Sequence, residues 1–148
     1  MMSTTPAFHI DPPAMAPADM SETAIQRQML VMVRRLFPEC LIAHVPNGGK
    51  RHKLEAAHLK ANGVLAGFPD LVITWLGGAA FCEVKDRDGK VSKDPKKDSD
   101  QERVLSDLHN QGHPVGVFRH DRTLHDFLRR HGAPFKPKWP HQFLPEPT

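Results

Sequence analysis

Apolar residues recur at helical spacing in the first third of the chain. Ser21 is a good N-cap, and the apolar positions that follow it continue to Phe37, directly before Pro38. These positions are Ile25, Met29, Met32, Val33 and Leu36. The pattern predicts an amphipathic helix that begins at Ser21 and ends near Phe37.

Four short runs of apolar and β-branched residues predict strands. The first, 41–45, is closed by a Pro-Asn-Gly-Gly turn, and the last covers 115–118. The two central runs, 70–75 and 79–85, are joined through Gly77 and Gly78 and predict a hairpin. Both faces of this hairpin are apolar, which is typical of a sheet covered on both sides.

Three further helices are expected between and after these strands. Their ranges are 53–62, 100–111 and a last helix capped by Asp121, and they end at Gly63, Gly112 and Gly132. Leu54, Ala57 and Ala61 give the first of them a narrow apolar stripe. The order of elements predicts an α/β fold with a mixed central sheet flanked by helices.

The polar and proline-rich segments set the expected domain limits. Residues 1–20 contain four prolines without apolar periodicity, and 133–148 contain five, so both are expected to be loosely ordered tails around a domain at 21–132. Residues 86–100 hold Val91 as the single apolar side chain. One such residue cannot offset the entropy of ordering this segment, which predicts a mobile loop.

Composition is that of one ordinary globular domain. The chain has 148 residues, of which 39% are hydrophobic and 25% charged. No run approaches the ~20 apolar residues of a membrane-spanning helix, and Cys40 and Cys82 form neither a zinc-ligand spacing nor a disulfide framework. We therefore expect a cytoplasmic protein, in a bacterial or host-cell cytosol, without a membrane partner. P-loop, G-x-S-x-G and HExxH motifs are absent, which gives no support to ATPase, esterase or zinc-protease chemistry.

Net charge is +3 and the pI is near 9.0, which mildly favours an anionic partner. Basic side chains gather in two places along the chain. They could bind an anionic partner, and the alternative interpretation is that they form two solvated faces. The groups are Lys50, Arg51, Lys53 and Lys60, and then Arg119, Arg122, Arg129, Arg130, Lys136 and Lys138.

Charged residues at the ends of the hairpin are candidates for a metal-binding site. A turn symmetric about Gly77 and Gly78 would pair Asp70 with Lys85 and would place Asp70, Glu83 and Lys85 on one face, with the two acids about 7–8 Å apart at Cα. Buried charges are costly unless they are compensated, and oxygen-only ligands suit Mg²⁺ or Mn²⁺ rather than zinc. The alternative is a turn residue at Asp70 and a salt bridge between Glu83 and Lys85.

Three other positions flank this group in the expected fold. Glu22 lies in the first turn of the first helix on its core-facing side, and Gln101 opens the third helix. Asn47 and the two glycines after it end the first strand. Each also has an ordinary explanation: an acid favoured by the helix dipole, an exposed polar residue and a plain turn.

Taken in order, these residues resemble the stand-alone VRR-NUC nucleases within the PD-(D/E)xK nuclease fold. The segment Gly67-Phe68-Pro69-Asp70-Leu71, followed by Glu83-Val84-Lys85, carries most of the resemblance. The segment between Lys85 and Gln101 is longer and more charged than in typical members, and Asp98 stands where a serine is frequent. The other matching positions are Glu22, Ile25, Gln26, Asn47, Gly48, Gly49, Lys60, Gly63 and Gln101.

The resemblance implies a restriction-endonuclease-like fold and a metal site. Glu22, Asp70, Glu83 and the Val84 carbonyl would hold Mg²⁺, with Mn²⁺ as a substitute. Lys85 would position or activate the attacking water, and Gln101 would orient the site. The residues expected to bind DNA are Asn47, Gly48, Lys50, Arg51, Lys53 and Lys60.

The function expected from this resemblance is Mg²⁺-dependent endonucleolytic cleavage of branched DNA, with four-way junctions as the expected substrate. A chain this short can enlarge the surface that contacts DNA by forming a homodimer. Candidate contacts of such a dimer are Phe135, Trp139 and Phe143. The alternatives are a non-catalytic nucleic-acid-binding module of the same fold and a restriction-type enzyme that reads a short sequence. The full set of site residues argues against the first, and the lack of a separate recognition domain within 148 residues argues against the second.

Overall fold

Five strands form one mixed sheet in the computed structural model, which describes residues 8–46, 53–91 and 101–137. The strand order is β1-β5-β4-β3-β2, with β1, β4 and β5 parallel and β2, β3 and β4 antiparallel. The strands are β1 (His9–Ile10), β2 (Leu41–His44), β3 (Leu71–Trp75), β4 (Gly78–Val84) and β5 (Val115–Phe118). The helices are η1 (Pro13–Met15), α1 (Glu22–Leu36), α2 (Lys53–Ala61), α3 (Gln101–Asn110) and α4 (Asp121–Arg130).

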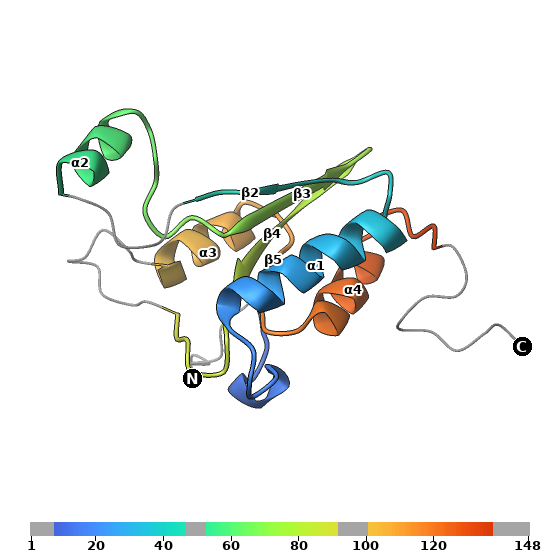
Figure 1. The fold of residues 1–148 in the computed structure, drawn as a ribbon. Coiled ribbons are helices and arrows are strands. Elements are labelled where there is room, and N and C mark those ends of the chain that lie inside the picture. Colours follow the sequence, from blue (N-terminus) through green and yellow to red (C-terminus); the bar gives the residue numbers. More distant parts are fainter. Residues whose placement is uncertain (1–7, 47–52, 92–100, 138–148) are drawn as a thin grey trace, which may run out of the picture.

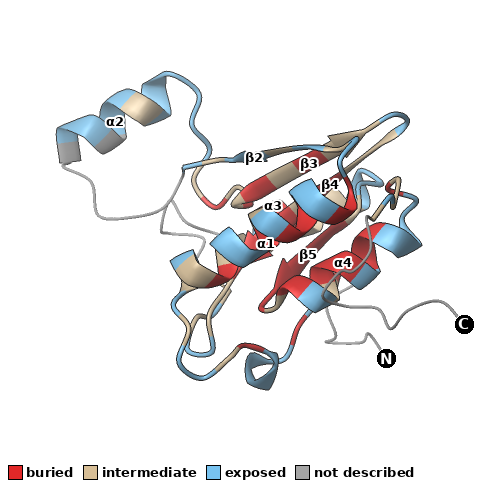
Figure 2. Cartoon of the chain, turned by 45° about the vertical axis from the view of Figure 1, so that its right-hand side comes forward, coloured by how far each residue is buried: buried red, intermediate tan, exposed pale blue. Residues whose placement is uncertain are grey.

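Helices cover both faces of this sheet (Figure 1). On one face α1 and α4 lie side by side, and their buried residues join those of β3 and β4 in the larger core. On the other face α3 places Leu105 and Leu108 against Val115 and Val117 of β5. Figure 2 shows the buried residues along the sides of α1 and α4 that face the sheet. The predicted α/β architecture, a mixed sheet flanked by helices, is confirmed.

The first helix forms as the sequence predicts. Ser21 Oγ accepts a hydrogen bond from the Ala24 N–H at 3.1 Å, and α1 ends at Leu36. Its buried residues are the five apolar positions of the predicted stripe. Helical periodicity therefore located this element and the face it buries.

The turn of the β3–β4 hairpin lies one position earlier than expected, which changes the partner of each residue by two positions. Trp75 pairs with Gly78, so the loop is Leu76-Gly77 and the register pairs Leu71 with Cys82. Of these two glycines only Gly77 takes a positive φ, of 87°, while a Cβ on Gly78 would lie 2.6 Å from the Trp75 indole. Close packing against Trp75, rather than turn geometry, explains why position 78 is a glycine. A shift of two residues leaves each side chain on its expected face.

Residues 8–20 belong to the folded domain, which corrects the expectation of a loosely ordered tail over 1–20. β1 pairs in parallel with β5, and Phe8 packs with Leu105 and Val117. Asp11 is 1% exposed and its N–H bonds the Val117 carbonyl at 2.9 Å. A strand of two residues has no apolar period to detect, so the sequence pattern could not predict it.

The C-terminal boundary and the start of α4 also differ from expectation. His120, not Asp121, is the N-cap of α4, and its ring accepts from the Arg122 N–H. Beyond residue 132, Ala133 is buried and Phe135 packs 5.5 Å from Phe37 between ring centroids. Core contacts therefore extend past the expected domain end.

Helix α2 projects away from the sheet (Figure 1). Leu54 is 76% exposed, so the expected apolar stripe of this helix is not buried within the described part of the chain. No helix among the described residues has the length and apolar character needed to cross a bilayer.

Replacing Phe8 tests whether residues 8–20 are part of the domain. Phe8 is 7% exposed and packs with the core residues on the α3 face of the sheet. We therefore expect Phe8→Ala to lower the unfolding free energy measured by urea titration by about 3–5 kcal/mol. The control, Met15→Ala at a residue that is 41% exposed, is expected to change it by less than about 0.5 kcal/mol. Equal, small effects of both variants would restore the view of a loose tail.

Candidate metal centre

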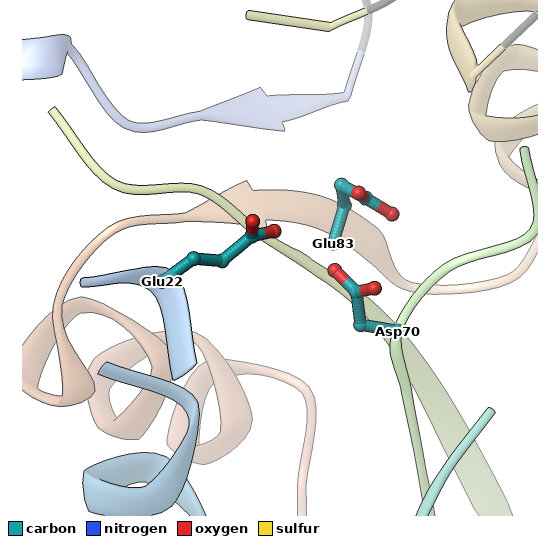
Figure 3. A group of neighbouring side chains, drawn as sticks. All are labelled: Glu22, Asp70 and Glu83. Atoms are coloured by element: carbon teal, nitrogen blue, oxygen red, sulfur yellow. The ribbon is translucent and has the colours of Figure 1, made fainter. Parts of the chain in front are cut away.

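Three carboxylates converge at one end of the sheet (Figure 3). Glu22 is the first residue of α1, Asp70 directly precedes β3 and Glu83 lies near the end of β4. One carboxylate oxygen from each lies within 4.8 Å of the others. The structure thus brings together the three side chains that the sequence nominated as metal ligands.

The hairpin register places two of these acids closer than expected. Continuing the observed pairing by one residue sets Asp70 opposite Glu83, and directly opposite residues have Cβ atoms about 4.5–5.5 Å apart. The Val84 N–H donates to Asp70 Oδ2 at 2.8 Å, and the Val45 N–H donates to the Asp70 carbonyl at 2.7 Å. Backbone contacts therefore fix Asp70 at the mouth of the hairpin.

Glu83 is the most buried member of the group, with 1% exposure. Its Oε1 accepts from Gln101 Nε2 at 2.9 Å and lies 3.5 Å from Lys85 Nζ. Its Oε2 is buried and has no hydrogen-bond partner within the described residues. Burial, followed by the negative charge of Asp70, raises the pKa of Glu83 to about 9, although Lys85 acts in the opposite direction.

Glu22 experiences the same crowding of negative charge. Burial and then the charge of Asp70 raise its pKa, and the carboxylate of Asp86 adds to the effect. Sequence reasoning missed Asp86. Its position directly after Lys85 was the available signal, but it lay in a segment expected to be a solvated loop. Asp86 Oδ1 instead accepts from the Gly89 N–H at 2.7 Å and orders this turn.

The donor set fits a hard divalent cation. Carboxylate oxygens are the ligands that Mg²⁺ and Mn²⁺ prefer, and the group contains neither histidine nor cysteine. A cation would compensate the mutual repulsion of the acids and would give the buried Glu83 Oε2 a partner. Glu22, Asp70 and Glu83 can therefore hold such an ion.

The remaining predicted residues divide between this centre and the segments around α2. Lys85 and Gln101 contact Glu83, and Val84 contacts Asp70 through its N–H. Lys60 is exposed on α2, where Lys53 is the first residue. Asn47, Gly48, Lys50 and Arg51 lie outside the described residues.

The predicted loop at 86–100 is only partly described, and the described part is anchored. The guanidinium groups of Arg87 and Arg119 bond main-chain carbonyls there and in the 14–16 segment. The expectation of mobility is wrong for 86–91, because main-chain hydrogen bonds hold these residues and Val91 packs against the core residues beside α3. Positions 92–100 are outside the described residues.

Comparisons of the chain with models of protein families, with curated proteins and with solved structures found no match. The architecture and the carboxylate cluster therefore rest on this chain's own sequence and structure. The resemblance to VRR-NUC nucleases remains a hypothesis about its site residues.

Stability of the metal-free protein should fall as pH rises. The pKa of Glu83 is about 9 in the fold and near its ordinary value of 4.5 when unfolded, so between these limits the folded chain binds one more proton. The unfolding free energy then decreases with pH, by at most about 1.4 kcal/mol per unit. We expect thermal melts in EDTA to show this decline from pH 5 to pH 9.

Glu83→Gln should flatten that profile and raise the melting temperature at pH 8, since an amide keeps the shape but not the charge. The matched control is Glu55→Gln at an exposed position of α2, which should leave the profile unchanged. Identical slopes for wild type and Glu83→Gln would show that Glu83 is not the destabilising group.

Proposed function

We propose that this protein is a Mg²⁺-dependent DNA endonuclease with a PD-(D/E)xK site of the VRR-NUC type. The observation that carries the proposal is the buried Glu83 carboxylate, which lies beside two further acids and a lysine. The order of these residues along the chain also resembles that family. Enzymes of this kind hydrolyse phosphodiester bonds, so the proposed substrate is the DNA backbone.

Each residue at the site has a role in this chemistry. Glu22, Asp70 and Glu83 would hold Mg²⁺, together with the Val84 carbonyl that the resemblance implies. When bound, Mg²⁺ supplies Lewis-acid stabilisation of phosphate charge and promotes ionisation of water. The other groups act from the protein itself.

Lys85 and Gln101 would support the reaction in different ways. Lys85 Nζ is 3.5 Å from Glu83 Oε1 on a side chain that is 12% exposed, so it is a fixed positive charge that can stabilise the negative charge developing on phosphate. Gln101 donates to the same oxygen at 2.9 Å and thereby fixes the Glu83 rotamer.

We further propose that the substrate is branched DNA and that the active species is a homodimer. Helix α2 projects from the end of the sheet where the acids lie, since β2 leads into it and its return segment ends at Asp70. Its exposed Lys60 could contact a phosphate beside the site. A two-fold dimer presents two equivalent sites, and a four-way junction offers two equivalent strands to cut.

Removing a carboxylate tests the site. We expect Asp70→Asn or Glu83→Ala to lower cleavage at least about 100-fold, while the fold is kept or stabilised because like-charge repulsion is relieved. Gel assays with Mg²⁺, Mn²⁺ and EDTA, beside circular dichroism melts, measure both effects. Asp107→Asn, at an exposed carboxylate of α3, is the matched control and should cleave as wild type does. Full activity in either site variant would refute the assignment.

Substrate preference needs a separate test. With labelled four-way junction, flap, single-stranded and linear duplex DNA, we expect the junction to be cut fastest, by a dimer seen in light scattering at micromolar concentration. Binding should weaken steeply with salt as phosphate contacts are lost. A monomer that cuts linear duplex as fast as junctions would contradict the branched-DNA proposal and leave the metal site untouched. A protein that binds DNA in Mg²⁺ but never cleaves it would favour the non-catalytic alternative.

A further inference from the structure

Arg119, directly after β5, donates all of its guanidinium nitrogens to main-chain carbonyls. The residue is 4% exposed. Its Nε bonds the Asp11 carbonyl at 3.1 Å, its Nη2 bonds the Gly89 carbonyl at 2.9 Å, and its Nη1 bonds the Asp86 carbonyl. One buried side chain thus connects Asp11, directly after β1, with the turn that follows Lys85.

Asp11 holds this arginine in place. Its Oδ2 accepts from the Arg119 N–H at 2.9 Å and from the Thr123 hydroxyl, and its Oδ1 lies 2.6 Å from His9 Nε2. Burial alone would raise the pKa of Asp11, but hydrogen bonds from His9, Thr123 and Arg119 outweigh it and lower the pKa. Asp11 is therefore ionised at neutral pH and compensates the buried guanidinium.

The turn whose carbonyls accept hydrogen bonds from Arg119 begins one residue after Lys85. Asp86 Oδ1 accepts from the N–H groups of Asp88 and Gly89 at 3.0 and 2.7 Å, which closes the turn. The Lys85 N–H bonds the Phe118 carbonyl at 3.1 Å. Contacts on both sides of Lys85 therefore determine the path of the main chain as it leaves β4.

A purely structural contact would not require this arrangement. Buried charged groups contribute little net stability compared with apolar residues of similar volume. The planar guanidinium, however, presents donors in a fixed fork that can define the positions of several carbonyls together. Its targets here are two carbonyls of the segment that carries Lys85 and Asp86 next to the acids.

We propose that Arg119 is a positioning residue of the metal centre, which with Asp11 fixes the 84–89 segment so that Lys85 lies beside Glu83 and the Val84 N–H reaches Asp70. This inference rests on the proposed nuclease function. It makes β1 part of the site machinery, although β1 contributes no side chain to the acidic cluster.

The test compares Arg119→Lys with a stability-matched control. Lysine keeps the charge but loses the fork, so we expect kcat to fall about 10–100-fold and Mn²⁺ affinity in calorimetry to fall as well, with KM for DNA within about threefold. Leu128→Ala removes a fully buried side chain of α4, away from this segment, and should lower Tm while changing kcat and Mn²⁺ affinity less than threefold. A purely structural role of Arg119 predicts equal effects from both variants.

Asp11→Asn provides the same test if Arg119→Lys does not fold. It keeps the side-chain shape, and we expect a smaller fall in kcat and Mn²⁺ affinity in the same direction. If wild type cleaves DNA and binds Mn²⁺ but these variants behave like Leu128→Ala, only the positioning role is overturned. If wild type neither binds Mn²⁺ nor cleaves DNA, the proposed function fails and the positioning role fails with it.

Discussion

A carboxylate that is almost fully buried has to be protonated or compensated, and Glu83 is in that position beside Asp70 and Glu22. Gln101 and Lys85 both approach its Oε1, which leaves Oε2 without a partner in the described chain. Without a cation, the fold tolerates this only by keeping the proton on Glu83 up to about pH 9. The same constraint supports the proposal that the three carboxylates hold a divalent ion, which would compensate their charge.

The architecture concentrates the compensating groups at one end of the sheet. β4 ends there, β3 begins there, and the first residues of α1 and α3 are Glu22 and Gln101. Because α1 and α3 cover opposite faces, their N-termini approach the hairpin mouth from both sides (Figure 1). Helix N-termini also favour negative charge nearby, which adds to the stability of the acidic group.

Sequence periodicity predicted the elements that bury an apolar stripe or a full strand. The buried face of α1 and the common face of Asp70, Glu83 and Lys85 both follow from side-chain period, and the latter is unchanged by the shift in hairpin register. The exact turn was missed because two glycines were available, and the packing of Trp75 on Gly78 cannot be read from their order.

Segments held by polar contacts escaped sequence reasoning altogether. Asp11 and Arg119 are 108 positions apart, and neither lies in an apolar pattern. Their contacts nevertheless order both β1 and the turn after Lys85, which were expected to be a tail and a mobile loop. Hydrogen bonds between distant main-chain groups leave no local signal in composition, so low apolar content was mistaken for lack of structure.

Anomalous diffraction from crystals soaked in Mn²⁺ locates a bound ion without reference to activity, and so shows whether the three carboxylates form a metal centre. We expect a strong anomalous peak bounded by oxygens of Glu22, Asp70 and Glu83, and none at this place in crystals of the Glu83→Ala variant. Manganese bound only elsewhere, with no peak among these three carboxylates, would show that they are not a metal centre.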